Sequence, residues 1–242
     1  MRLSTVWGTL SALVVAFSSS VAVAATDDKA TADAKGGKPD PVDMIFERNH
    51  LANIDPGKEL VYKFKRTVTN PELLGQPFTD DITLKVNAAK PEGGRDVDLQ
   101  IYTGDRARDL QRMPDRLHNP LFIVYFNQAV NSFSQLAGGQ RPYLTRAFSM
   151  GFKEKSKVEP VKVDYKGKKI DAYRISMTPY AGDPNESKMQ GWEGAEYIVV
   201  VSKEVPGEII DLIAKYKNKY PGDLQLVERI TLDGVTGLED AK

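Results

Sequence analysis

The sequence lacks cysteine altogether, so it can form no disulfide and has no thiol to which a lipid could be attached. A secreted chain of this size without disulfides is unusual for a eukaryote but ordinary for the bacterial periplasm. Export is itself predicted, because residues 1–25 have the pattern of a signal peptide: Arg2, an apolar core from Leu10 to Phe17, and small residues at Ala22-Val23-Ala24. We therefore expect cleavage after this segment and a location in the periplasm of a Gram-negative bacterium.

An excess of charge of either sign is also missing. The chain has 33 Lys and Arg against 33 Asp and Glu, and the signal segment contains only Arg2, which leaves 32 basic against 33 acidic residues after cleavage. A nucleic-acid-binding protein would show a basic excess, so nucleic acid is not an expected partner. The same balance gives no general attraction to an anionic membrane.

Histidine is scarce, and the usual catalytic motifs do not occur. His50 and His118 are the two histidines, far apart in sequence, and no nucleophile elbow, phosphate-binding loop or dinucleotide fingerprint is present. Asp183, Asn185 and Glu186 are close in sequence but lack the spacing of a calcium-binding loop. We therefore predict no metal, no cofactor and no enzymatic activity. A hydrolase using His50 or His118 remains an alternative, because catalytic partners need not be neighbours in sequence.

The most apolar stretch, from Asn119 to Lys155, predicts two consecutive helices and not a membrane span, since Asn and Gln interrupt it. Asn119-Pro120 is typical of a helix start, and Gly138-Gly139 of a helix end. A second helix is expected from Pro142 to about Lys155. Both helices are plain core helices in one interpretation and line an apolar ligand cavity in the other.

Strands are predicted on both sides of this stretch, because apolar and polar residues alternate with a period of two. The segments lie around residues 60–67, 81–87, 96–101, 161–165, 173–177, 197–201 and 224–232. We expect the strand at Tyr197–Val201 to be central, since it is apolar on both faces.

Four further elements are expected from shorter signals. A helix starts at Asp40 with Val42, Ile45 and Phe46 on its apolar face. Residues 105–116 form a loop or short surface helix, residues 181–194 form a long loop, and a short amphipathic helix starts at Pro206-Gly207 and reaches Tyr216. The Lys-rich run between residues 153 and 169 indicates a solvated hairpin face or, alternatively, a contact with an acidic lipid or partner.

This order predicts an α+β fold: a strongly curved antiparallel β-sheet, or half-open barrel, packed on a central pair of apolar helices. The expected organisation is a signal peptide over 1–25, a flexible linker over 26–39, one domain over 40–235 and a polar tail over 236–242.

The export signal, the meander of amphipathic strands and the apolar helical insert together resemble the periplasmic lipoprotein-carrier superfamily, the LolA and LolB group. The resemblance is one of layout across about residues 40–235, and the family's lipoprotein-handling arginine matches no position here. It implies an incomplete barrel covered by helices, with a cavity that takes acyl chains.

We therefore expect a non-enzymatic periplasmic carrier or binding protein for a lipid or other hydrophobic ligand, which does not span the membrane after cleavage. Ligand sites are mostly apolar hollows with a few polar groups. The aromatic residues predicted to line the hollow are Phe122, Phe126, Phe133, Phe148, Phe152 and Trp192. The alternative is an envelope assembly or protein-interaction factor whose core is filled.

Overall fold

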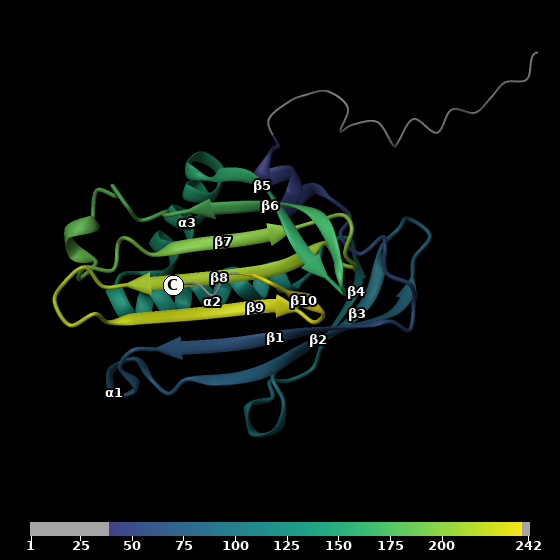
Figure 1. The fold of residues 1–242 in the computed structure, drawn as a ribbon, viewed down its shortest axis with the longest axis horizontal. Coiled ribbons are helices and arrows are strands. Elements are labelled where there is room, and N and C mark those ends of the chain that lie inside the picture. Colours follow the sequence, from purple (N-terminus) through teal and green to yellow (C-terminus); the bar gives the residue numbers. More distant parts are fainter. Residues whose placement is uncertain (1–38, 239–242) are drawn as a thin grey trace, which may run out of the picture. The chain divides into compact units, whose positions relative to one another are not determined.

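In the computed structural model, which describes residues 39–238, antiparallel strands form one strongly curved sheet that is not closed into a barrel (Figure 1). Its order is β10-β5-β6-β7-β8-β9-β1-β2-β3-β4. The predicted signal peptide and all of the predicted linker except Pro39 lie outside the described residues. The strands are β1 (Glu59–Val68), β2 (Phe78–Ala89), β3 (Arg95–Ile101), β4 (Gln111–Arg116), β5 (Lys157–Tyr165), β6 (Lys168–Met177), β7 (Glu196–Val201), β8 (Ile209–Lys217), β9 (Gln225–Leu232) and β10 (Val235–Thr236).

The alternation in β1 shows why one face of the sheet is dry. Leu60, Tyr62 and Phe64 are buried on the concave face, whereas Lys63 and Lys65 are exposed. The strand pairs with β2 on one side and with β9 on the other, so it joins the strands before the helices to those after them. The predicted curved antiparallel sheet is confirmed, and β7 lies inside it between β6 and β8 as expected.

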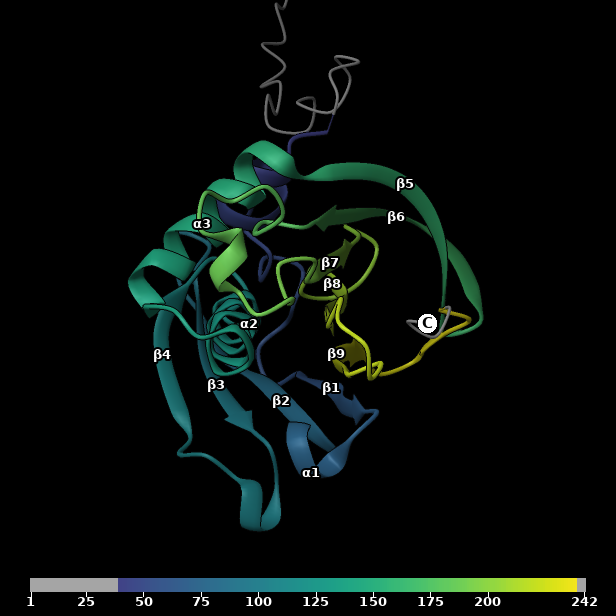
Figure 2. The same ribbon diagram turned by 90° about the vertical axis from the view of Figure 1, so that its left-hand side faces the viewer.

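Two helices cover the concave face, α2 (Leu121–Ala137) and α3 (Arg141–Lys155). Figure 2 shows α2 almost end-on within the curve of the sheet, with α3 beside it. The Asn119 side chain accepts a hydrogen bond from the Leu121 N–H (3.1 Å), which satisfies a free donor of the first turn. Gly138 and Gly139 both have positive φ, and they turn the chain between the two helices.

Shorter helical segments complete the described chain. A π-helix, η1 (Asp43–Glu47), stands where a helix from Asp40 was expected, and its Phe46 is 46% exposed instead of facing the core. The others are α1 (Pro71–Leu74), η2 (Gly104–Arg106) and η3 (Glu186–Lys188), the last within the expected loop 181–194. None of the helices in this part of the chain is long and apolar enough to cross a membrane.

Two sequence expectations were wrong. The segment from Pro206 to Tyr216 is not a helix: from Ile209 it is strand β8, and nearly all its residues are buried. A strand covered on both faces has no clean period of two, so its apolar spacing also fits a helix. Residues 105–116, expected as a loop or surface helix, include the edge strand β4, whose residues are largely exposed.

Candidate ligand-binding site

The structure brings three of the six aromatic residues predicted to line a cavity into one hollow. Phe126, Phe148 and Phe152 meet where η1, α2 and α3 come together. We call this hollow the seam pocket, and its volume is about 110 Å³. It is lined by Phe46, Phe126, Asn127, Val130, Thr145, Phe148, Ser149 and Phe152.

The walls of the seam pocket are mainly aromatic rings in mutual contact. The Phe126 ring centroid lies 5.4 Å from that of Phe148 and 5.9 Å from that of Phe152. Phe46 packs against Phe126 and Phe152 at 5.7 and 5.5 Å, and because it is also half exposed it forms the rim. Sequence reasoning did not include Phe46, since the pattern after Asp40 assigned it to the core. Three side-chain positions on the wall are polar, namely Asn127, Thr145 and Ser149.

The other three predicted residues fill the core instead. Phe133 is fully buried and stacks on Tyr180 with ring centroids 3.8 Å apart. Phe122 packs against the His50 ring at 5.1 Å, and Trp192 is buried in the loop between β6 and β7. Pockets for drug-sized ligands are usually about 300–1,000 Å³. The seam pocket is smaller, so in this conformation a long acyl chain does not fit in it.

Hydrogen bonds attach helix α2 to the sheet, and their donors lie on the helix and on the sheet. The Tyr125 hydroxyl donates to the Ile213 carbonyl oxygen (2.6 Å), and the Tyr216 hydroxyl donates to that of Ala129 (3.1 Å). In the C-terminal half of α2, the Ser132 hydroxyl donates to the buried carboxylate of Glu228 (2.8 Å), which also pairs with Arg66. Breaking these hydrogen bonds would leave buried donors and acceptors without partners, which costs free energy, so α2 is held firmly against the sheet.

Helix α3 is attached by packing and by hydrogen bonds that are mostly exposed, among them the bond that the Tyr143 hydroxyl donates to Asp183. The Tyr180 hydroxyl donates to the Leu144 carbonyl oxygen at 3.4 Å, and Lys155 at the end of the helix donates to the carbonyl oxygens of Pro179 and Ala181 in the loop after β6. Gly151 lies directly on Pro179, where an added Cβ would be 2.5 Å from the proline Cβ. The rest of the contact consists of rings such as Phe148 on Tyr197 (4.8 Å). Of the two helices, α3 has the weaker attachment.

One buried tyrosine beneath the helices has no hydrogen-bond partner. The hydroxyls of Tyr125, Tyr180 and Tyr216 bond to main-chain oxygens, whereas that of Tyr197 has no partner among the described residues. Burial raises the pKa of Tyr197 well above its ordinary value. The hydroxyl is therefore neutral at physiological pH.

The two histidines, far apart in sequence, are neighbours in the fold, with ring centroids 5.8 Å apart. His50 is fully buried; its Nε2 bonds to the Met44 carbonyl oxygen (2.8 Å) and its Nδ1 accepts from the Asn119 N–H (3.3 Å). His118 bonds through Nδ1 to the Arg48 carbonyl oxygen (2.8 Å). Within the described chain no serine hydroxyl is hydrogen-bonded to either ring. These contacts connect η1 to the start of α2.

The remaining sequence candidates are engaged locally. Asp183 accepts from the Tyr143 hydroxyl (2.6 Å) and from the Asn185 N–H, and Glu186 accepts from the Gly182 N–H. No group of three or more His, Cys, Asp or Glu side chains in residues 39–238 is arranged to hold a metal ion.

No known protein family matches the sequence, and no curated protein is similar to it. Solved structures that resemble the fold include the MucA/MucB complex of Pseudomonas aeruginosa, with a TM-score of 0.32 and 10% identity over 80% of this chain and 57% of that chain. Another is lipoprotein LppX of Mycobacterium tuberculosis, with a TM-score of 0.31 and 11% identity over 84% of this chain and 96% of that chain. A third is a DUF1329 family protein of Desulfovibrio piger, with a TM-score of 0.21 and 12% identity over 84% of this chain and 97% of that chain. The function proposed below does not depend on these similarities.

Proposed function

We propose that this protein is an exported, non-enzymatic binding or carrier protein for an apolar chain, which it takes up in the seam pocket as α3 moves away from α2. The supporting observation is the pocket itself, an aromatic hollow between two helices with the half-exposed Phe46 at its rim. Buried aromatic side chains at a site accessible from outside are typical of hydrophobic ligand sites. The predicted signal peptide supports a periplasmic location for this function.

The difference in attachment between the helices gives the uptake a physical basis. Hydrogen bonds to β8 and Glu228 hold α2 in place, while ring contacts hold most of α3. Apolar contacts are non-directional, so a ligand chain can replace Phe148 and Phe152 as the partner of Phe126 with little loss of buried apolar area. Asn127, Thr145 and Ser149 are available to orient a polar group of the ligand.

A fluorescent fatty-acyl probe tests this proposal. The delipidated wild-type protein should bind the probe saturably, and Val130→Phe, which fills the pocket, should weaken binding at least about tenfold. Ile123→Phe is the matched control, because Ile123 is on the same helix but 61% exposed and away from the pocket. Equal binding by both variants, or no saturable binding by the wild type, would contradict the proposal.

The proposed movement of α3 can be tested separately, because the chain has no native cysteine. Asn127→Cys with Thr145→Cys places one thiol on each helix, both on the wall of the pocket. Joining them with a short bis-maleimide should slow probe uptake strongly relative to the same variant whose two thiols are capped separately with N-ethylmaleimide. Unchanged uptake in the joined protein would show that α3 need not move.

The second candidate function is an envelope interaction factor with a filled core. It is supported by the small volume of the seam pocket and by the burial of Phe122, Phe133 and Trp192. In that case cross-linking in the periplasm should capture a stable protein partner, and the native protein should carry no lipid in organic extracts.

A further inference from the structure

The outward face of α3 combines exposed apolar and basic side chains in one stripe. Tyr143, Arg146, Met150 and Lys153 follow one another at spacings of three and four residues, which places them on the same side of a helix. The apolar members are accessible, with Tyr143 39% and Met150 46% exposed. The opposite side of the helix carries the buried residues Leu144, Phe148, Gly151 and Phe152.

The stripe carries more basic than acidic charge, with Glu154 four residues after Met150 as its acidic neighbour. Helix α3 has four basic residues and one acidic residue, Glu154. In the described chain no acidic side chain forms an ion pair with Arg141, Arg146 or Lys153. In the hairpin β5–β6, which is also rich in lysine, three of the basic side chains are paired, as Lys157–Glu159, Lys162–Asp171 and Lys169–Asp164. Helix α3 therefore presents three basic side chains that are free of ion pairs within residues 39–238.

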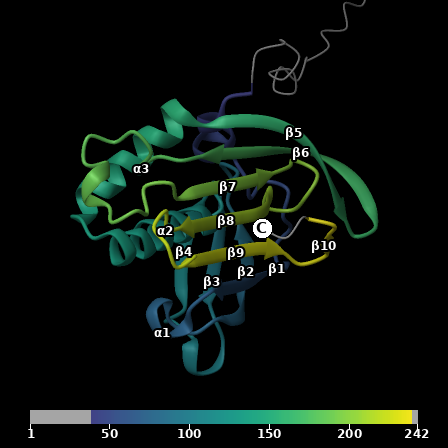
Figure 3. The same cartoon turned by 60° about the vertical axis from the view of Figure 1, so that its left-hand side comes forward.

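Apolar hollows lie on both sides of the stripe. On one side is the seam pocket, with Phe46 at its rim. On the other is a groove of about 310 Å³ between α3 and the loop after β6. Figure 3 shows this loop beside the helix. Tyr143, Ala147, Met150 and Pro179 contribute to its wall. A helix with its apolar residues flanked by Arg and Lys is suited to the boundary between lipid headgroups and acyl chains.

We infer that the outward face of α3 is a docking surface for an anionic lipid bilayer. Arg146 and Lys153 contact lipid phosphates, and Tyr143 and Met150 enter the headgroup boundary. This orientation brings the rim of the seam pocket to the membrane surface. The inference does not rest on the proposed carrier function, because the stripe and its charges are present whether or not the pocket takes a ligand.

Vesicle flotation with the mature protein tests the inference. The protein should float with vesicles of phosphatidylglycerol and phosphatidylethanolamine at low salt, and remain unbound with pure phosphatidylcholine. Each basic residue near an anionic surface is worth about fivefold in affinity, so Arg146→Gln with Lys153→Gln should weaken binding about 25-fold. Met150→Ser should weaken it without changing its dependence on salt.

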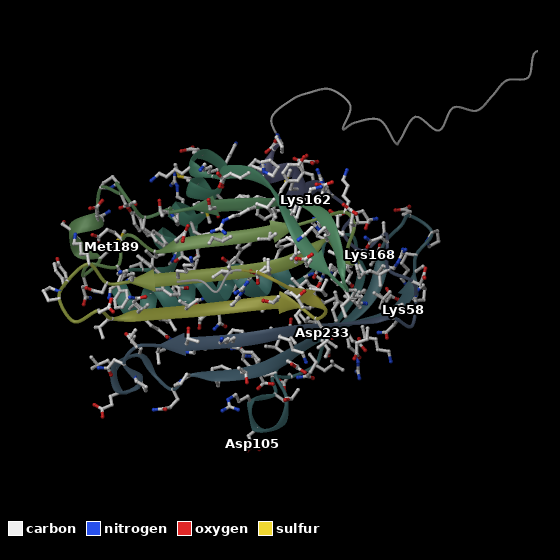
Figure 4. The ribbon with its side chains drawn as sticks, in the orientation of Figure 1. Lys58, Asp105, Lys162, Lys168, Met189 and Asp233 are labelled. Atoms are coloured by element: carbon white, nitrogen blue, oxygen red, sulfur yellow. The ribbon has the colours of Figure 1, made fainter. Side chains whose placement is uncertain are left out.

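Lys58→Gln with Lys85→Gln is the control, since it removes the same charge from two exposed lysines remote from α3. Figure 4 shows Lys58 at the far side of the molecule from α3. Circular dichroism should show that all variants are folded. The inference is overturned if wild type does not float with anionic vesicles, or if both double variants lose the same affinity. Loss of vesicle binding with retained uptake of a soluble acyl probe would separate this inference from the carrier function.

Discussion

At the scale of single residues, His50 is the most unusual group in the molecule. Its ring is completely buried, accepts a hydrogen bond from the Asn119 N–H and holds the Met44 carbonyl of η1. Burial lowers its pKa, and the nearby His118 and Arg48 act in the same direction. Protonation would therefore place a charge in the core and remove the acceptor used by Asn119.

The sign of the resulting pH dependence follows from linkage. Above the unfolded pKa of about 6.5 the ring is neutral in both states; as the pH falls below it, the unfolded chain takes up a proton that the native ring resists. We expect the wild type to lose more stability between pH 7.5 and 5.5 than His50→Gln does. Thermal unfolding at both pH values measures this difference. His118→Gln removes an exposed ring, so this variant should lose nearly as much stability between the two pH values as the wild type. If His50→Gln lost as much stability as the wild type, the argument would be contradicted.

Gly207 shows how closely the chain packs around Asn119. Gly207 has φ +74° in the turn before β8, and a Cβ there would lie 2.9 Å from the Asn119 side-chain nitrogen. That nitrogen donates to the Gly207 carbonyl oxygen and to the Tyr62 hydroxyl. The sequence shows Pro206-Gly207 as a break in the pattern, but the need for glycine arises from its contact with a residue 88 positions away.

At the scale of elements, the attachment of α2 to the sheet can be measured with two similar tyrosines. Tyr125→Phe removes a hydroxyl bonded to β8 and leaves a buried carbonyl without that donor, which should cost about 1–2 kcal/mol of unfolding free energy. Tyr197→Phe removes a hydroxyl that has no partner, so its effect should be near zero or stabilising. Urea unfolding compares the two directly. Equal losses would mean that Tyr197 makes a hydrogen bond in solution and that the distinction is wrong.

Individual strands show when the apolar–polar pattern of a segment predicts its secondary structure correctly. In β1 and β2 one face is wet, so alternation is visible and both strands were predicted. In β8 both faces are covered, and the apolar run from Ile209 to Tyr216 fits a strand and a helix equally well. β4 was missed for the opposite reason, because five of its six residues are exposed and its strand conformation comes from pairing with β3.

At the scale of the whole molecule, stability is expected to vary across the fold. β7, β8 and β9 lie within the sheet, and β7 and β8 are almost wholly buried, whereas α3 has an exposed outer face and β4 is an edge strand. Local opening is easiest where few buried contacts are lost. Native-state hydrogen exchange should therefore show the slowest amides in β7–β9, intermediate ones in α2 and faster ones in α3 and β4. Protection of α3 equal to that of α2 would remove the basis for a moving helix.

The α+β class, the curved antiparallel sheet and the pair of helices between two groups of strands could be predicted from the amino-acid pattern, because they depend on local periodicity and on Asn, Pro and Gly at helix ends. Packing between distant segments was needed to show that β1 joins β9, that His50 meets His118, that Phe46 stands at the rim of the seam pocket and that Phe122, Phe133 and Trp192 fill the core. The spacing of apolar and polar residues along the chain indicates only which side chains prefer water and which prefer the protein interior. Which side chains then share one space, and how much of it they leave empty, depends on how distant segments pack.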